Sequence, residues 1–395
     1  MRPIAAASTG FVLALAWGMA TSGPPVGAQT FDGRAIFRFD TFGSEQLWTD
    51  TLRLHDAIET LSPAAALGVG LKVDVDALPP AVITALASGQ VDLNDPAVTL
   101  VLLQLNAVVG VIGTVAGSQL TSVGITCAFC HSTVDNSLTA GIGHRLDGWP
   151  NLDLDVGRIA ALSPVFRPSL KAEFRRWGPG KYDPRHHIFD GTTITLLHPG
   201  ERSLPVVIPP AYGLVAIETV TGDGPISYWN SYVGVTQMGG QGSFSDPRIG
   251  VSVTQTPDLV TPKLPALLAY QLSLAAPPAP AGSFDAAAAA RGQAIFNDAA
   301  LGPGRCARCH IPPLYTDLPR LHAPAEVGQD PRYAQRSANK LYRTTPLRAL
   351  WQHPPYFHDG SAADLDAVVK HYDHFFRLHL TRQQKADLVE FLKSL

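Results

Sequence analysis

Two copies of one five-residue pattern hold all four cysteines of this 395-residue chain. Residues 127–131 read CAFCH, and residues 306–310 read CARCH. Each copy places two thiols three residues apart and an imidazole directly after the second thiol. Because no cysteine lies outside the two copies, the pattern itself is the first feature whose chemistry needs an explanation.

Three chemistries use thiols at this spacing. Disulfides are common in exported proteins, and two Cys-x-x-Cys pairs are able to bind zinc, but neither explains the two histidines. Covalent c-type haem uses all three residues, since the thiols become thioethers to the haem and the imidazole is the proximal iron ligand. The sequence therefore predicts two haem c groups attached through Cys127, Cys130, Cys306 and Cys309. The predicted proximal ligands are His131 and His310.

The first 28 residues have the composition of an export signal. Arg2 is the only charged residue before Asp32, FVLALAWGMA is apolar, and VGA ends at Ala28 in a small-residue cleavage pattern. The apolar segment is too short to span a bilayer, and an uncleaved anchor is the alternative. We expect residues 1–28 to be removed and the protein to be periplasmic. A formal net charge of −3 gives no indication of binding to nucleic acid or to an anionic membrane.

The stretch at residues 98–117, VTLVLLQLNAVVGVIGTVAG, has no charged residue. Gln104, Asn106 and three glycines among β-branched residues argue against a membrane span there, and we expect none in the mature chain. AGSQ separates two apolar runs, as in a hairpin. We expect a buried helix followed by a strand or hairpin that leads into the first motif.

Two further stretches surround the first motif. Residues 45–61 place Leu47, Leu54, Ile58 and Leu61 on one face of a helix. From about residue 186 to 251, the runs TTITLL, PVVIPP, GLVAIETV and ISYWNSYVGVTQM are rich in strand formers and punctuated by Gly and Pro. These runs predict strands and loops added to the first haem domain.

The second motif lies in a shorter region. Residues 275–283, AAPPAPAGS, are typical of a linker. Asp285 then precedes an alanine-rich helix as its N-cap, and Thr381 and Gln384 have capping-box spacing near the C-terminus. The terminal helix carries an apolar stripe of Leu388, Phe391, Leu392 and Leu395. We predict a mainly α fold of two cytochrome c-like haem domains, residues 29–274 and 284–395, the first enlarged by loop-rich and β-hairpin segments.

Residues 344–373, TTPLRALWQHPPYFHDGSAADLDAVVKHYD, followed by LTRQQKADLVEFL, resemble the bacterial di-haem cytochrome c peroxidase/MauG family. The resemblance is strong over residues 284–395 and reduces to the first motif over the N-terminal part. It implies an exported protein with one c-type haem per domain, often a calcium ion between the domains, and reaction with hydrogen peroxide at one haem. TTPLRAL lacks the family's Asn after Leu-Arg, and the acid and amide of the peroxide pocket have no identified counterpart. No catalytic residue is therefore assigned.

The sixth ligand of the second haem separates an open, peroxide-reactive iron from an electron-transfer iron. The three methionines, Met1, Met19 and Met238, all precede the linker, which excludes Met within residues 284–395. The resemblance places Tyr372 at the position that is Met in the peroxidases and Tyr in MauG. His358, inside PYFHDG, is the next candidate.

A helical wheel supports Tyr372 independently. Tyr372 shares one face with Leu365, Val369 and Phe376, whereas His371 lies about a quarter-turn or more away from that face. A face buried toward the haem would present Tyr372 and not His371, although an ordinary core tyrosine is the alternative.

For the first haem, His144 in GIGHRLDG and Met238 in VTQMGGQG are equal candidates for the sixth ligand. Both lie in glycine-rich loops, which let the chain approach a porphyrin closely. His55 is a more distant candidate, and an open site is the remaining alternative.

The resemblance also implies a tryptophan between the haems and a calcium site. Trp149, Trp177 and Trp229 are the candidates for the tryptophan. Thr344 and Pro346 match the family's calcium-binding carbonyl positions, and Asn151 is a candidate ligand from the first domain, in keeping with the oxygen ligands that calcium takes.

Two functions are consistent with these features. The first is a periplasmic di-haem oxidoreductase of the peroxidase/MauG type, which receives electrons from a small redox protein (a cytochrome c or a cupredoxin) and reduces hydrogen peroxide. The second is a non-catalytic electron-transfer shuttle or haem subunit with both irons six-coordinate. The spin states of the two irons discriminate between the two functions.

Overall fold

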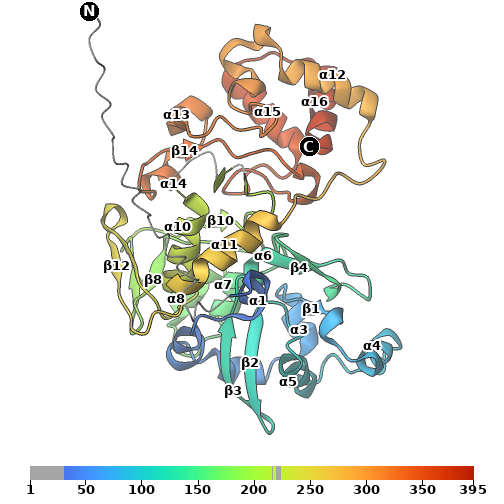
Figure 1. Ribbon diagram of the computed structural model, residues 1–395. Coiled ribbons are helices and arrows are strands. Elements are labelled where there is room, and N and C mark those ends of the chain that lie inside the picture. Colours follow the sequence, from blue (N-terminus) through green and yellow to red (C-terminus); the bar gives the residue numbers. More distant parts are fainter. Residues whose placement is uncertain (1–30, 216, 219–223) are drawn as a thin grey trace, which may run out of the picture. The chain divides into compact units, whose positions relative to one another are not determined.

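The computed structural model describes residues 31–215, 217–218 and 224–395 (Figure 1). The predicted export signal, residues 1–28, lies outside these ranges. Within them, none of the helices combines the length and apolar character that crossing a membrane requires.

Short helices with polar or proline-containing first turns make up the start of the described chain. Asp32, Ser62 and Asp95 each accept a backbone N–H as N-cap residues, and Pro63, Pro80 and Pro96 occupy first-turn positions. The helices are α1 (Gly33–Phe39), α2 (Leu54–Glu59), α3 (Pro63–Gly68), α4 (Pro80–Ala87) and α5 (Pro96–Gln104).

The expected helix at residues 45–61 is interrupted. A π-helix, η1 (Gln46–Thr51), is separated from α2 by Arg53, whose φ of 52° is left-handed. Leu47 and Leu54 are nevertheless both buried, so the apolar stripe faces the core as predicted. The periodicity identified the buried residues but not the break between them.

The helix and hairpin expected before the first motif are confirmed. After α5, Asn106 turns the chain with a φ of 53°, and β2 (Val111–Ala116) pairs antiparallel with β3 (Gln119–Ile125), Val111 opposite Ile125. The hairpin leads directly into α6 (Ala128–His131), which contains most of the first motif (Figure 1).

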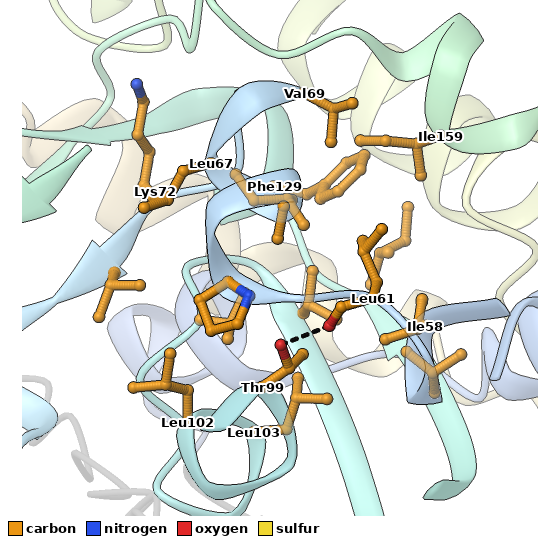
Figure 2. Close-up of a pocket in the computed structure, with 18 of the residues that line it drawn as sticks. Ile58, Leu61, Leu67, Val69, Lys72, Thr99, Leu102, Leu103, Phe129 and Ile159 are labelled. Carbon is orange, nitrogen blue, oxygen red and sulfur yellow. Dashed lines mark hydrogen bonds between the residues drawn. The ribbon is translucent and has the colours of Figure 1, made fainter. Parts of the chain in front are cut away.

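An apolar cavity lies behind this motif (Figure 2). Phe129, the aromatic residue of CAFCH, lines it together with Trp48 and with side chains of α3, α5 and the hairpin. At its edge Thr99 donates a hydrogen bond of 2.6 Å to the carbonyl of Leu61. Neither the thiols nor the histidine of the motif line this cavity, so it belongs to the core that supports α6 from behind.

Every sheet in the described ranges has only two strands. The pair β1 (Val73–Asp74) and β5 (Ile142–Gly143) is parallel, and the others are antiparallel. The antiparallel pairs are β4 (Ser132–Val134) with β6 (Arg145–Asp147), β7 (Lys181–Tyr182) with β10 (Val206–Val207), β8 (His187–Phe189) with β9 (Ile194–Leu196), β11 (Phe244–Asp246) with β12 (Val251–Val253), and β13 (Leu321–His322) with β14 (Tyr342–Arg343).

The strand prediction for residues 186–251 is only partly correct. TTITLL and PVVIPP contain β9 and β10, but ISYWNSYVGVTQM forms α10 (Pro225–Tyr232) and the π-helix η3 (Val233–Gln237). Of the described residues of GLVAIETV, Val215, Ile217 and Glu218 are also helical. Pro225 suits a first helical turn, and Tyr228 stacks on Tyr232 one turn later at 6.3 Å. Arg185 lies 4.4 Å from the centre of the Tyr232 ring. Packing of the aromatic face thus overrides the strand propensity.

Further α-helices lie in the N-terminal segment, the name used here for residues 32–274. They are α7 (Val156–Ala160), α8 (Pro168–Phe174) and α11 (Leu264–Ser273). The predicted linker, residues 275–283, holds neither helix nor strand where it is described.

The C-terminal segment, residues 284–395, is mostly helical. Asp285 caps α12 (Ala286–Phe296) and Thr381 forms the predicted capping box of α16 (Arg382–Ser394) with Gln384. The two helices cross closely, since a Cβ at Gly292 would lie 2.0 Å from the carbonyl oxygen of Asp387. Between them in sequence lie α13 (Pro324–Val327), α14 (Pro331–Gln335), α15 (Leu365–Phe376) and the 3-10 helices η6 (Ala299–Gly304), η7 (Cys306–Arg308) and η8 (Leu350–Gln352).

The core of this segment is the predicted apolar stripe. Leu388, Phe391 and Leu392 of α16 pack with Phe296 of α12 and Val369 of α15. A helical fold with small sheets is therefore confirmed. Contacts join residues 32–395 into one unit, and the division into two haem domains stays a prediction.

Candidate haem-binding sites

The first motif presents its histidine in one fixed orientation. Nδ1 of His131 lies 3.0 Å from the carbonyl oxygen of Pro209 and donates a hydrogen bond to it, which leaves Nε2 for a metal. The backbone around the motif is also held, because Gly148 N–H donates to the carbonyl of His131 and Asn151 N–H to that of Cys130. A backbone carbonyl on the far nitrogen is the usual support of a metal-binding imidazole.

The second motif repeats this arrangement. Nδ1 of His310 lies 3.0 Å from the carbonyl oxygen of Tyr315. The turn is closed by His310 N–H, which donates to the carbonyl of Cys306 at 2.9 Å. In both motifs the imidazole is thus locked through Nδ1 and offers Nε2, as a proximal haem ligand must.

Burial shifts the pKa values of the cysteines and the histidine of the first motif. Cys127 and Cys130 are partly exposed as whole residues, and burial of their thiols raises the pKa of each to about 12. The pKa of His131 is lowered by burial, although its ring is also partly exposed. The described cysteines form no disulfide with one another, so all four thiols remain free for thioether bonds.

The same holds around the second motif. Burial raises the pKa of the Cys306 thiol to about 11 and lowers the pKa of His310. Both side chains are partly exposed. The residues of both motifs consequently fit covalent haem attachment, since each motif offers two cysteines without a disulfide and one oriented Nε2.

Tyr372 faces the second motif. Burial raises the pKa of its hydroxyl to about 12, and the hydroxyl lies near enough to Cys306 and Cys309 to be coupled to them electrostatically. Its hydroxyl also receives a long hydrogen bond, 3.4 Å, from the amide of Gln329. No such influence of the thiols acts on His371, whose pKa is lowered by burial and whose Nε2 lacks a hydrogen-bond partner among the described residues. His371 and Tyr372 are both partly exposed, and Tyr372 as the sixth ligand stays a prediction.

His358 takes part in hydrogen bonds instead. Its Nε2 lies 3.2 Å from the hydroxyl of Tyr342, and its ring centre is 4.2 Å from that of Tyr333. Its carbonyl accepts a bond of 2.7 Å from Val207 N–H of β10. The PYFHDG motif thus joins the two segments through a strand that ends two residues before Pro209.

The candidates for the sixth ligand of the first haem are in different surroundings. His144 is exposed, and its Nδ1 lies 2.8 Å from Asp76, which raises the pKa of the imidazole. Met238 is 6% exposed, and its carbonyl accepts a hydrogen bond from the Trp48 indole. His55 pairs with its neighbour Asp56 at 3.2 Å. Of the three, only Met238 is buried.

Three residues near the first motif were not predicted. Burial raises the pKa of Tyr182 well above its usual value, and the phenol lies near enough to Cys130 to be coupled to it electrostatically. Its hydroxyl donates a short hydrogen bond to Gln237, whose amide donates to the carbonyl of His187 at 2.8 Å. Burial lowers the pKa of His187 to about 4, and its Nδ1 lacks a partner in the described structure. The sequence signal was the paired histidine in RHHIF.

Comparison with known proteins agrees with this geometry. No protein-family model matches the chain. A curated protein named methylamine utilization protein MauG, from Methylophilus methylotrophus, is 31% identical over 127 residues, covering 27% of this chain and 36% of the relative. The MauG of Methylorubrum extorquens is 30% identical over 124 residues, which cover 27% of this chain and 34% of that relative. Part of this chain is MauG-like. The predicted resemblance is thereby confirmed, and the chain spans about a third of the length of the curated relatives it matches.

A solved structure of hydrazine synthase from Kuenenia stuttgartiensis is also similar, at 22% identity and a TM-score of 0.32. The match covers 53% of this chain and 76% of the hydrazine synthase chain. So low a score supports no conclusion about the fold or function of the MauG-like chain.

One of the three predicted tryptophans lies between the two segments of the MauG-like chain. The ring of Trp149 meets that of Trp351 in η8 at 5.8 Å. Trp177 is buried and donates to Ser203 at 2.6 Å, and Trp229 is half-exposed against Arg185. Trp149 also lies between the two residues, Gly148 and Asn151, that bond to the first motif. Trp351 was missed because nothing in the local sequence marks it.

The predicted calcium residues are buried but not brought together by any contact of the structure. The carbonyl of Thr344 accepts a hydrogen bond of 2.7 Å from Thr316. Asn151 donates to the carbonyl of Gly70, and its Oδ1 lacks a partner among the described residues. Pro346 is buried beside Thr344. Calcium in this MauG-like protein stays a prediction.

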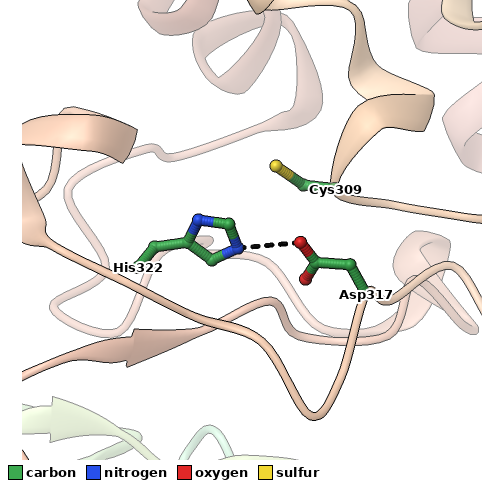
Figure 3. Close-up of side chains that lie close together, drawn as sticks. All are labelled: Cys309, Asp317 and His322. Atoms are coloured by element: carbon green, nitrogen blue, oxygen red, sulfur yellow. Dashed lines mark hydrogen bonds and ion pairs between the residues drawn. The ribbon is translucent and has the colours of Figure 1, made fainter.

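A further cluster adjoins the second motif of the MauG-like chain (Figure 3). One donor atom each from Cys309, Asp317 and His322 lies within 4.8 Å of the other two. The carboxylate of Asp317 and Nε2 of His322 are 2.9 Å apart, and the sulfur of Cys309 lies nearby. A cytochrome motif does not require this pair.

Proposed function

We propose that this protein is a periplasmic di-haem c-type cytochrome of the peroxidase/MauG type. In this function it takes electrons from a small redox protein, a cytochrome c or a cupredoxin, and reduces hydrogen peroxide. The observation that carries the proposal is the repeated arrangement of His131 and His310, each bonded through Nδ1 to a backbone carbonyl at 3.0 Å and each preceded by two cysteines without a disulfide.

Haem c, when bound at both motifs, supplies one-electron exchange and, where an iron coordination position is open, a site for peroxide. The chain contributes orientation. The carbonyls of Pro209 and Tyr315 hold the two imidazoles, and hydrogen bonding to Nδ1 raises the basicity of the ligating nitrogen. Both contacts exclude rotation of the ring away from the iron.

The two motifs differ in the groups available for the opposite side. At the second motif, Tyr372 supports a tyrosine ligand, which lowers the iron potential relative to methionine. Near the first motif, the Tyr182 hydroxyl and Gln237 amide form a hydrogen-bonded pair beside Cys130. This polar pair would be able to hydrogen-bond a peroxide oxygen, which favours the first motif as the place where a bound haem would react with peroxide.

Electrons move between the motifs through the aromatic contact of Trp149 with Trp351. The indole Nε1 of Trp351 is buried without a hydrogen-bond partner in the described chain. An indole without a hydrogen-bonded nitrogen loses its proton less readily when it is oxidised, so this ring favours simple electron passage.

The test uses the mature protein purified from a host that attaches haem c. A pyridine haemochrome spectrum with acid–acetone extraction measures covalent haem, and two non-extractable haems per chain are expected. Low-temperature EPR of the oxidised and half-reduced protein then reports spin states before and after addition of peroxide. A high-spin signal that peroxide abolishes supports the enzyme. Two unreactive low-spin haems would leave the electron shuttle, and extractable pigment would overturn both functions.

A further inference from the structure

We propose that Arg348 binds a propionate carboxylate of haem c where the two segments meet. The inference rests on the proposed haem attachment, but not on reaction with peroxide. It assigns a ligand to a cation that neither thioether formation nor iron ligation uses.

One N–H group of the Arg348 side chain is buried without a partner. Its Nη1 has no hydrogen-bond acceptor within the described chain. Its Nε donates to the backbone carbonyl of Tyr212 at 2.9 Å, which holds the guanidinium in place. Buried polar groups of folded proteins are nearly always hydrogen-bonded, so a missing acceptor indicates a bound group that the protein itself does not supply.

Two other arginines, Arg145 and Arg185, also have a buried N–H group without a hydrogen-bond partner. Each of them has another stabilising contact, because Nε of Arg145 lies 2.8 Å from the carboxylate of Asp74 and the guanidinium of Arg185 lies 4.4 Å from the centre of the Tyr232 ring. Arg348 has neither kind of contact in the part of the chain that the structure describes. Its charge therefore lacks a counter-charge.

The surroundings of Arg348 are electropositive. Burial lowers its pKa from 12.5 to about 10, and the charge of Arg343 in β14 lowers it further. Arg348 remains a cation at neutral pH with this pKa. Arg343 is itself exposed and has no acidic partner among the described residues. A partly buried cation with a second cation nearby and no acid favours an anion as its ligand.

On one side, Arg348 contacts the loop that supports the first motif. Its partner Tyr212 belongs to the same loop as Pro209, whose carbonyl orients His131. Gly213 allows the close approach, since its φ is 59° and a Cβ there would lie 2.5 Å from Cδ of Arg348. The guanidinium is thus held against the backbone beside the first proximal histidine.

On the other side, Arg348 belongs to the loop that passes the second motif. Burial lowers the pKa of His310, and the backbone of Tyr315 and of Thr345 opposes this change. Thr345 therefore lies close to the imidazole, and Arg348 follows in the same loop between β14 and η8. The arginine accordingly lies between the two histidines that are predicted to carry the irons.

A haem propionate explains these observations together. Its carboxylate accepts N–H bonds and supplies the missing negative charge. Arginine binds carboxylates through adjacent N–H groups of its planar fork, with bonds stronger than those between neutral groups. Because Nε is already engaged with Tyr212, the two Nη nitrogens of Arg348 are the donors to the propionate.

Spectroelectrochemical titration of the holoprotein at pH 7 is the first test. A cation beside a haem favours the reduced iron, so R348Q is expected to lower one midpoint potential. We expect the ferrous-to-ferric ratio at a given potential to fall about tenfold, equal to about 59 mV for a one-electron couple. R348K keeps the charge and should keep most of the potential. R382Q, at an exposed arginine at the start of α16, is the control and should match wild type.

The propionate bending band in the resonance Raman spectrum is the second readout, because it responds to hydrogen bonds at the carboxylate. It should change in R348Q and also in R348K, whose ammonium lacks the planar fork, but not in R382Q. Should R348Q fail to fold, the band of R348K still decides. A merely structural role of Arg348 would shift the potential equally in R348K and R348Q.

Two results would overturn the inference. One is a potential in R348Q equal to that in R382Q. The other is an unchanged propionate band in the Arg348 variants, which would mean that the arginine acts only through its charge at a distance. Repeating R348Q in C306A/C309A, which keeps only the first haem, assigns the propionate: a persisting shift places it on the first haem and a lost shift on the second. Failure of haem attachment appears separately in the haemochrome spectrum, and a haem unreactive with peroxide leaves the test unaffected.

Discussion

Trp149 and Trp351 meet edge to face, with ring centres 5.8 Å apart and planes at 79°. They lie 202 positions apart in the chain, one beside the first haem motif and one in the segment that carries the second. Tyr212 joins them, since its ring lies 6.5 Å from that of Trp149 and its hydroxyl donates to Gln352, the neighbour of Trp351, at 2.9 Å. The contact is the aromatic connection between the two proposed haem sites.

Replacing Trp149 or Trp351 by phenylalanine is expected to slow electron transfer between the haems by about tenfold or more, equal to about 1.4 kcal/mol of activation free energy. The physical reason is that a smaller ring, which is harder to oxidise, widens the gap between the two sites. Rapid mixing of the fully oxidised protein with one electron equivalent, followed optically, measures the rate. W229F, at a half-exposed indole away from this contact, is the control. Equal rates in all four proteins would exclude the tryptophan pair from the path.

Tyr372 is expected to set the spin state of the second haem. Y372F removes the hydroxyl that faces Cys306 and Cys309, so a low-spin EPR signal of the oxidised protein should become high-spin. H371Q, one residue earlier on α15, should leave the spectrum unchanged. If both variants keep the wild-type signal, Tyr372 is a core residue and not an iron ligand.

The buried ion pair between Arg336 and Asp183 links the two segments. The charged groups are 3.1 Å apart, and Arg336 also contacts Glu201 at 2.9 Å. R336M leaves the Asp183 carboxylate, 1% exposed, without its counter-charge, which is expected to lower the free energy of unfolding by about 3 kcal/mol. R332M, which breaks the exposed pair with Asp330, should cost less than about 1 kcal/mol. Urea unfolding of the holoproteins measures both, and equal losses would contradict the role of burial.

His187 is expected to make the protein less stable in mild acid. Burial lowers its pKa from 6.5 to about 4, so between these values the unfolded chain binds a proton that the folded chain excludes. The free energy of unfolding therefore falls as pH decreases from about 6.5 toward 4, by up to about 3 kcal/mol from this one group. H187Q should reduce the loss, as measured by urea unfolding at several pH values.

The control for that experiment is His144, whose effect on the pH dependence of stability has the opposite sign. Asp76 raises the pKa of the exposed His144, so the contribution of this pair to stability is present at low pH and is lost as pH rises through the raised pKa. H144Q should therefore slightly increase the loss of unfolding free energy at low pH, whereas H187Q should reduce that loss. A pH profile of H187Q identical to wild type would show that this imidazole is not buried in the folded protein.

The sequence by itself determined the features whose causes are local. The predicted haem attachment needs two thiols and an imidazole within five residues. The helices that start at Asp285 and Thr381 need a side-chain oxygen that accepts a hydrogen bond from a backbone N–H two or three residues later. The buried stripe of α16 and the face of α15 that carries Tyr372 follow from helical periodicity alone. Each of these predictions depends on residues that are neighbours in the chain.

Tertiary structure decided what depends on distant partners. The carbonyl that orients His131 belongs to Pro209, 78 residues away, and the ring opposite Trp149 comes from the other segment. The strand prediction at ISYWNSYVGVTQM failed because Arg185 and Phe244 pack against an aromatic helical face that propensity does not describe. Whether a histidine such as His144 or His187 lies on the surface or inside is likewise fixed only when remote segments meet, since burial is a property of the folded chain and not of its local sequence.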